Sequence, residues 1–78
     1  MRREERRLRA IIRLKLEASL LPREEPARIW AGPGNNEVCS ACDEKITTKQ
    51  TVYEWEFEGS KFQMHITCYD VWNTIRRR

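Results

Sequence analysis

The hydrophobic residues of the N-terminal segment recur at steps of three and four residues, with arginines in most of the gaps. This spacing gathers the apolar side chains on one side of an α-helix and predicts a basic amphipathic helix over residues 4–20, within a basic segment spanning 1–21. Proline disfavours helical geometry in the residue before it, so Leu21-Pro22 is the predicted end of this helix. The apolar positions are Leu8, Ile11, Ile12, Leu14, Ala18 and Leu21.

Residues 22–37 have no such period and contain Pro22, Pro26 and the run Gly32-Pro33-Gly34. Prolines and glycines at this density interrupt helices and central strands, so we predict a linker over 22–37. Ile29 and Trp30 are strongly apolar for a linker, and we expect both to lie in a groove on the domain that follows.

Apolar and polar residues alternate over residues 51–58, which is the pattern of a strand with one buried face. Tyr53, Trp55 and Phe57 fall on the buried side. Gly59-Ser60 places glycine first in a two-residue turn, as a type II′ hairpin turn requires. The cross-strand pairs that this turn predicts are Trp55 with Met64, Phe57 with Phe62, and Glu58 with Lys61.

A helical period returns over residues 65–76 and predicts a second helix. Thr67 and Asp70 have the spacing of a capping box, so we expect them to cap its first turn. The apolar face of this helix is formed by Cys68, Val71, Trp72 and Ile75.

Every cysteine of the chain and its one histidine fall into two pairs, C-x2-C at 39–42 and H-x2-C at 65–68. Two intervening residues allow a single tight turn to aim both side chains at one point, which is the spacing of zinc ligands. Four protein ligands fill a tetrahedron, whereas a catalytic zinc keeps a position open for water. The sequence therefore predicts one structural Zn²⁺, held by Cys39, Cys42, His65 and Cys68.

Length and charge fit this interpretation. A chain of 78 residues buries a thin core and usually needs a metal or disulfides, and three cysteines would leave one thiol unpaired in a disulfide framework. The net charge of +3 is uneven. Residues 1–28 carry nine Lys/Arg against five Asp/Glu, residues 29–75 carry three against seven, and 76–78 are all arginine.

No apolar run approaches the length of a membrane-spanning helix, and the arginine-rich start lacks the apolar core of a secretory signal. We therefore expect a cytoplasmic protein, in which thiols stay reduced and available to metal.

Together the segments predict a small α+β zinc-stabilised domain over residues 38–78. It would contain a zinc knuckle, a β-hairpin and a C-terminal helix, preceded by the basic helix and the linker. Because the ligands and the aromatic face of the hairpin lie beyond Val38, we expect this domain to stay folded without residues 1–21.

The order of knuckle, hairpin and ligand pair at a helix start resembles a treble-clef zinc finger. It is similar to the first zinc module of LIM domains and to the poly(ADP-ribose) polymerase type of zinc finger, which both run C-x2-C…H-x2-C. The stretch from His65 to Trp72 looks like the latter, in which an aromatic residue and a tryptophan follow the last cysteine.

This resemblance implies a fold and not the sensing of DNA breaks. The gap of twenty-two residues between the ligand pairs is shorter than in the polymerase family, and the domain lacks that family's DNA-binding basic residues. The whole chain, with Arg28–Gly34 ahead of the first cysteine pair, also looks like a group of small bacterial zinc-binding proteins. That likeness implies a bacterial source and no particular activity.

The leading functional hypothesis is a zinc-stabilised protein-interaction module, with residues 4–21 binding a protein partner or a second copy. One alternative is a nucleic-acid binder that uses the arginine-rich ends, although the acidic middle would repel phosphates. Another is a redox sensor in which oxidised thiolates release zinc. We do not expect an enzyme, because the histidine is committed to metal and no other base stands beside a nucleophile.

Overall fold

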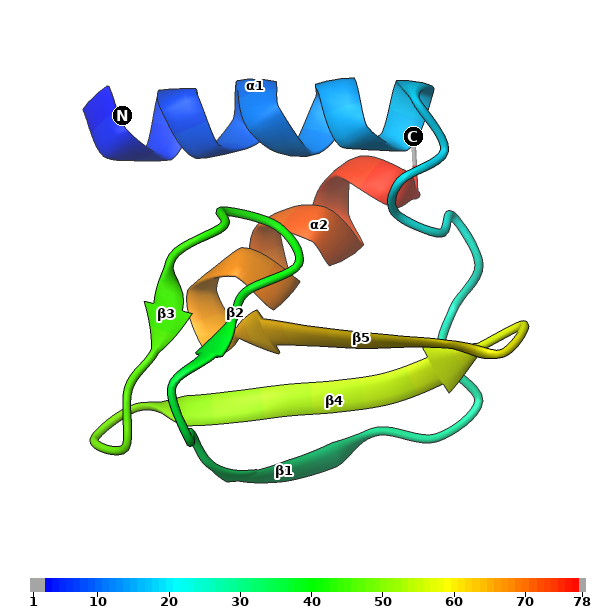
Figure 1. The fold of residues 1–78 in the computed structure, drawn as a ribbon. Coiled ribbons are helices and arrows are strands. Elements are labelled where there is room, and N and C mark those ends of the chain that lie inside the picture. The colour runs from blue at the N-terminus through cyan, green and yellow to red at the C-terminus, as the bar shows by residue number, and fades with distance from the viewer. Residues whose placement is uncertain (1–2, 78) are drawn as a thin grey trace.

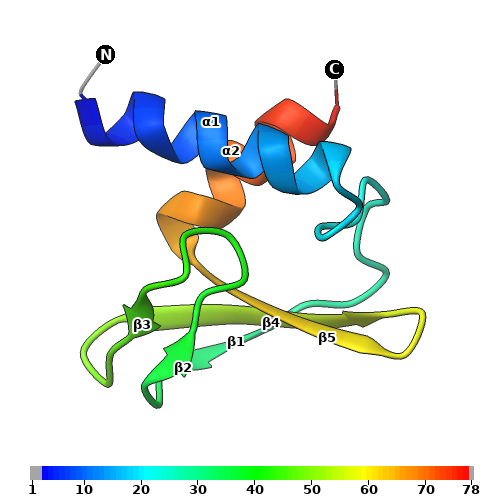
Figure 2. The ribbon, with the colours of Figure 1, turned by 45° about the horizontal axis from the view of Figure 1, so that its top comes forward.

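The computed structural model describes residues 3–77 and folds them into two helices and five strands. α2 lies between α1 and the main sheet, so the elements stack in three successive layers (Figures 1 and 2). Three strands form one antiparallel sheet in the order β1-β4-β5, and β2 pairs with β3 in a separate two-stranded sheet. The elements are α1 (Arg3–Glu17), β1 (Trp30–Pro33), β2 (Glu37–Val38), β3 (Lys45–Ile46), β4 (Thr51–Phe57), β5 (Ser60–His65) and α2 (Ile66–Arg76).

The end of α1 is set by its own backbone. Ser19 adopts the left-handed conformation with a φ of 61°, and the N–H of Leu20 donates to the carbonyl of Lys15 at 2.8 Å. This is the bond pattern of a Schellman motif, which stops a helix by satisfying its last carbonyls. The prediction that Leu21-Pro22 ends the helix was therefore wrong, because the chain leaves the helical conformation before it reaches the proline.

The buried side of α1 is formed by residues four apart in the sequence. Ile12 and Leu16 are 0% and 4% exposed, and Leu8 packs against them. Leu14 belongs to the predicted apolar face but is 64% exposed, because its side chain lies on the opposite side of the helix. The amphipathic helix is confirmed, with a buried face rotated away from Leu14.

The segment predicted to be a linker is tied to the second helix and supplies a strand. The indole N–H of Trp72 donates to the carbonyl of Pro22 at 2.9 Å, and the Arg76 guanidinium lies 3.7 Å from Glu25. Further along the segment, β1 pairs with β4 at the edge of the sheet. An edge strand accepts a proline such as Pro33, because one side of its backbone has no strand to receive a hydrogen bond.

Trp30 lies opposite Glu54 in the β1–β4 pairing and is 52% exposed. Ile29, the residue before β1, is 38% exposed. The expectation that both are held in a groove was wrong, because neither is buried. Strand pairing directs Trp30 to the outer surface of the sheet, where its half-exposed ring lines only a shallow hollow.

The hairpin of β4 and β5 turns one residue earlier than predicted. Glu58 and Gly59 both have positive φ, at 51° and 82°, which is the requirement of a type I′ turn rather than type II′. The pairing is therefore shifted by two residues, so that Trp55 lies opposite Phe62 and Tyr53 opposite Met64. A shift of two keeps each side chain on its predicted face. In this register Lys61 lies opposite Glu56 rather than Glu58, and its ammonium group forms an ion pair with Glu54 at 3.0 Å.

α2 begins directly after β5, with His65 as its N-cap residue and no side-chain cap bond. The predicted cap by Thr67 and Asp70 was wrong, because the helix starts at Ile66 and Thr67 already lies inside its first turn. The predicted inner face is confirmed. Its buried residues are Cys68, Trp72 and Ile75, with Val71 packed beside them.

Both helices and the sheet share one hydrophobic core. Trp55 of β4 stacks against Phe62 at 5.8 Å and lies 4.9 Å from Trp72 of α2, measured between ring centroids. Ile12 and Leu16 of α1 belong to the same cluster of buried side chains. Among residues 3–77, no helix combines the length and apolar character needed to cross a membrane.

Candidate metal centre

The first cysteine pair lies in the tight turn between β2 and β3. The N–H of Cys39 donates to the carbonyl of Glu44 at 2.8 Å, and the N–H of Asp43 donates to the carbonyl of Cys39 at 3.0 Å. Asp43 takes a left-handed φ of 66°, which lets the chain reverse within this short loop. We call residues 37–46 the knuckle. Its turn brings the side chains of Cys39 and Cys42 to the same side.

The second pair lies where β5 passes into α2. His65 is the last residue of β5, and Cys68 lies in the first turn of the helix. The knuckle is joined to this strand by two hydrogen bonds, because the N–H of Ser40 donates to the carbonyl of Gln63 at 2.7 Å and the N–H of Gln63 donates to Ser40 Oγ at 3.1 Å. These bonds hold the turn that carries two cysteines against the edge of β5.

The fold brings all four predicted ligands together. Their ligand atoms all lie within 4.8 Å of one another, and none of the three cysteines forms a disulfide. The Nδ1 atom of His65 lies 3.5 Å from Cys42 Sγ and 3.6 Å from Cys68 Sγ.

These distances fit a tetrahedral ion. Metal–sulfur bonds of about 2.3 Å and metal–nitrogen bonds of about 2.0–2.1 Å place ligand sulfur and nitrogen about 3.6 Å apart. Three thiols and one imidazole also form the donor set that soft or borderline metals prefer. The residues Cys39, Cys42, His65 and Cys68 can therefore hold one metal ion.

The other nitrogen of the His65 ring has a partner of its own. Nε2 lies 3.1 Å from the carbonyl oxygen of Lys45 in β3, and a carbonyl only accepts, so Nε2 carries the proton. In the neutral ring, Nδ1 is the nitrogen whose lone pair faces the thiols of Cys42 and Cys68. Ligating histidines usually make this kind of second hydrogen bond, which fixes the ring orientation and the tautomer.

The three thiols disturb one another's titration. The hydrogen bond from the Cys68 thiol holds the pKa of Cys39 well below its usual range, and the same bond raises the pKa of Cys68. Burial raises the pKa of the Cys42 thiol. Deprotonation of one thiol, Cys39, is thus favoured. Deprotonation of the other two is opposed by the charge of that first thiolate and by burial. A bound cation reverses that opposition by compensating all three negative charges.

Lys15 of α1 supports the knuckle in a way that sequence reasoning missed. Its Nζ donates to the carbonyl of Ser40 at 2.9 Å and to Asp43 Oδ1 at 2.8 Å. Both acceptors belong to the turn between β2 and β3. In the sequence, Lys15 is one of many basic residues on the helix, and no local pattern sets it apart.

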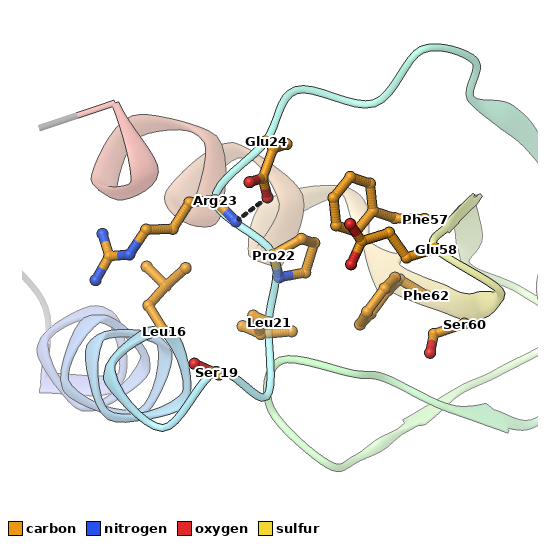
Figure 3. A pocket seen from close by; sticks show the side chains of 10 residues that line it. All are labelled: Leu16, Ser19, Leu21, Pro22, Arg23, Glu24, Phe57, Glu58, Ser60 and Phe62. Carbon is orange, nitrogen blue, oxygen red and sulfur yellow. Dashed lines mark hydrogen bonds between the residues drawn. The ribbon is translucent and has the colours of Figure 1, made fainter.

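A surface hollow lies away from this cluster, between the end of α1, residues 19–24 and the tip of the hairpin (Figure 3). It holds about 370 Å³, with Leu16 on one side and Phe57 and Phe62 on the other. None of the four metal ligands lines it, and its charged residues Arg23, Glu24 and Glu58 lie around the apolar ones. We therefore place the candidate site at the Cys/His cluster.

Comparisons of this chain with known protein families, with curated proteins and with solved structures found no significant match.

Proposed function

We propose that this is a structural zinc protein, in which one Zn²⁺ is bound by Cys39, Cys42, His65 and Cys68. The observation that carries the proposal is the convergence of three thiols and one imidazole nitrogen at tetrahedral separations. The knuckle, the hairpin and the ligand pair at the start of α2 follow one another in the order of a treble clef. We assign the zinc a structural role, since four protein ligands leave no position for water or substrate.

Metal analysis tests this assignment. Protein purified with zinc present should contain one equivalent per chain, and its Co²⁺ derivative should have the absorption of a tetrahedral site with three thiolates. Cys42→Ser should lose most of the metal, whereas Glu44→Ala, at an exposed position of the same turn, should keep it. Less than half an equivalent of zinc in the unmodified chain would contradict the proposal.

We also propose that the zinc-stabilised body serves as an interaction module, with the outer face of α1 as its binding surface. This outer face consists of exposed residues, namely Arg6, Arg7, Ala10, Arg13, Leu14 and Glu17. Leu14 is 64% exposed at its centre, although leucine is a strongly apolar residue. An exposed apolar side chain ringed by arginines is suited to a protein contact, because arginine combines charge with an apolar stem.

Comparative capture experiments test the module. Zinc-loaded protein should retain a partner from extract, Leu14→Glu should lose it, and Thr48→Glu on a distant exposed loop should behave like the unmodified chain. Equal capture by all three proteins would refute the role of α1.

Nucleic-acid binding is a second candidate, supported by the exposure of Arg6, Arg7 and Arg13 on one side of α1. Arg2 and Arg78, which also supported this hypothesis, lie outside the described residues. Binding through arginines alone should be indifferent to sequence and should weaken steeply with salt. A sequence-selective complex that resists salt and survives Arg7→Glu would make nucleic-acid recognition the leading function instead.

A further inference from the structure

The face of the main sheet turned away from α2 carries an exposed aromatic residue among charges. Trp55 and Tyr53 of β4 contact α2, so strand alternation directs Glu54 and Glu56 to the opposite side. Trp30 lies directly opposite Glu54 in β1 and therefore shares that side. We call Trp30, Glu54, Glu56 and Lys61 the outer sheet face.

A hollow of about 350 Å³ lies within the outer sheet face, lined by Trp30, Glu54, Glu56 and Lys61 together with Trp55. Trp30 is 52% exposed at its margin. The Trp30 ring already accepts a cation from its own chain, because the Arg28 guanidinium lies 5.8 Å from the ring centroid. An aromatic ring beside two carboxylates is the chemistry that recognises a guanidinium group.

The charges around the hollow are predominantly negative. Lys61 lies 3.0 Å from Glu54, and the carboxylates of Glu54, Glu37 and Glu56 together raise the pKa of Lys61. The hollow itself is lined by two carboxylates, Glu54 and Glu56, against one lysine. The charge of Glu37, which also acts on Lys61, offsets that of Arg28 beside Trp30. The ligand that fits this surface is cationic, with an apolar stem to cover the tryptophan.

A cationic surface of this kind is present on the same chain, on the outer face of α1. The outer face of α1 has three arginines against one glutamate, with Leu14 exposed between them. α1 and β1 lie at opposite ends of the layer stack, as Figure 1 shows. Two α1 faces would repel each other through their arginines, whereas an α1 face and an outer sheet face have opposite charges.

We propose that the outer sheet face binds the arginine-rich outer face of α1 of a second copy, with one arginine entering the hollow beside Trp30. This inference rests on the proposed role of α1 as a binding surface and names its partner. Because the two surfaces differ, the contact is heterologous and leaves one free surface of each kind at the ends of any open assembly. Copies therefore add head to tail.

Charge reversal on each surface tests the contact in the full-length, zinc-loaded protein. A helix variant, Arg7→Glu with Arg13→Glu, keeps its sheet face, and a sheet variant, Glu54→Lys with Glu56→Lys, keeps its helix face. By sedimentation velocity at low salt, the unmodified chain should grow beyond a dimer as its concentration rises. Each variant alone should be monomeric, because its two surfaces then carry the same sign of charge. An equal mixture should associate again, because the intact sheet face of one variant meets the intact helix face of the other.

Controls separate this contact from general charge effects. Lys49→Glu and Thr48→Lys, on an exposed loop away from both surfaces, should associate like the unmodified chain. Trp30→Ala should weaken association by about tenfold or more, as removal of a central interface aromatic does. Thermal unfolding of each variant identifies any that lose the fold, and Trp30→Phe, which keeps an aromatic ring, should recover most of the association.

A monomer at all concentrations, or a helix variant and sheet variant that still associate alone, would overturn the head-to-tail contact. If the unmodified chain is monomeric but captures an extract protein that Leu14→Glu loses, the module proposal stands and this one fails. Association that Leu14→Glu leaves intact would instead remove α1 from the interface.

Discussion

At the scale of single residues, Gly34 lies directly after β1 and against the backbone of residues 46 and 47, where there is no room for a side chain. A Cβ atom at this position would lie 2.6 Å from the carbonyl oxygen of Ile46 and would also collide with the carbonyl oxygen of Thr47. Both obstacles are backbone atoms, which cannot rotate out of the way as a side chain can. The N–H of Gly34 is meanwhile held to the carbonyl of Gln50 at 2.8 Å, so the glycine cannot move away.

Gly34→Ala should therefore destabilise the zinc-loaded protein by about 1–3 kcal/mol, the usual cost of overpacking. Gly32→Ala is the matched control, because a Cβ there meets nothing within 4 Å. Chemical unfolding of both variants measures the difference. Equal stabilities would show that the knuckle shifts to accommodate the methyl group.

At the scale of elements, α1 has leucines on two sides, and only one side is buried. Leu16 is 4% exposed in the shared core, whereas Leu14 is 64% exposed on the outer face. Leu16→Ala should lower the free energy of unfolding by about 2–5 kcal/mol, because it leaves a cavity. Leu14→Ala should change it little. If thermal unfolding found Leu14→Ala the more damaging, the helix would be rotated in solution.

The hairpin turn gives a second test, in which two changes have opposite signs. Glu58 has a φ of 51° and Gly59 a φ of 82°, so both positions of the turn are left-handed. Asparagine tolerates this region better than glutamate, so Glu58→Asn should stabilise the protein by about 0.5–1 kcal/mol. Gly59→Ala should destabilise it by about 1–2 kcal/mol. A neutral Glu58→Asn would indicate that the turn is not type I′.

The same elements show which parts of a fold can be predicted from sequence. Alternation fixed the faces of β4, because that inference needs only a period of two. It could not place the turn, since one glycine suits the second position of a type I′ turn as well as the first of a type II′ turn. β1 could not be predicted from the sequence, because Pro33 and the glycines on either side of it disfavour any strand except one at the edge of a sheet.

For the candidate site, the local spacing of cysteines and histidine identified the four residues that the fold brings together. The supporting contacts could not be predicted in the same way. Lys15 reaches the knuckle across 25 and 28 residues, and the carbonyl of Lys45 that faces His65 is a backbone group. Contacts of this kind depend on tertiary packing, which no short pattern records.

At the scale of the whole molecule, α1 and residues 38–78 share one core. Ile12, Leu16 and Leu21 are buried in the same cluster as Trp72. This packing changes the expectation for a chain without residues 1–21. Removal of the segment would expose Trp72 and Ile75, so we now expect the shortened protein to lose stability.

Metal removal should unfold most of the protein, because so small a core gains much of its stability from the centre. Structural zinc contributes about 10–16 kcal/mol of apparent binding free energy in zinc-finger peptides. Chelation, or Cys68→Ser, should therefore collapse the dispersion of the amide resonances. The effect of chelation should reverse when zinc is restored. A chelated sample that keeps its dispersed spectrum would show that the metal is incidental to the fold.

The bridge from Lys15 to the knuckle has a thermodynamic consequence. Its ammonium group favours the turn in which Cys39 and Cys42 are already aimed at the metal, so docking of α1 lowers the ordering cost of the centre. By reciprocity, the factor by which a docked helix tightens metal binding equals the factor by which the metal tightens helix docking. The concentration of free metal would therefore control how often α1 leaves the core, and any change that exposes the inner face of α1 would weaken metal binding.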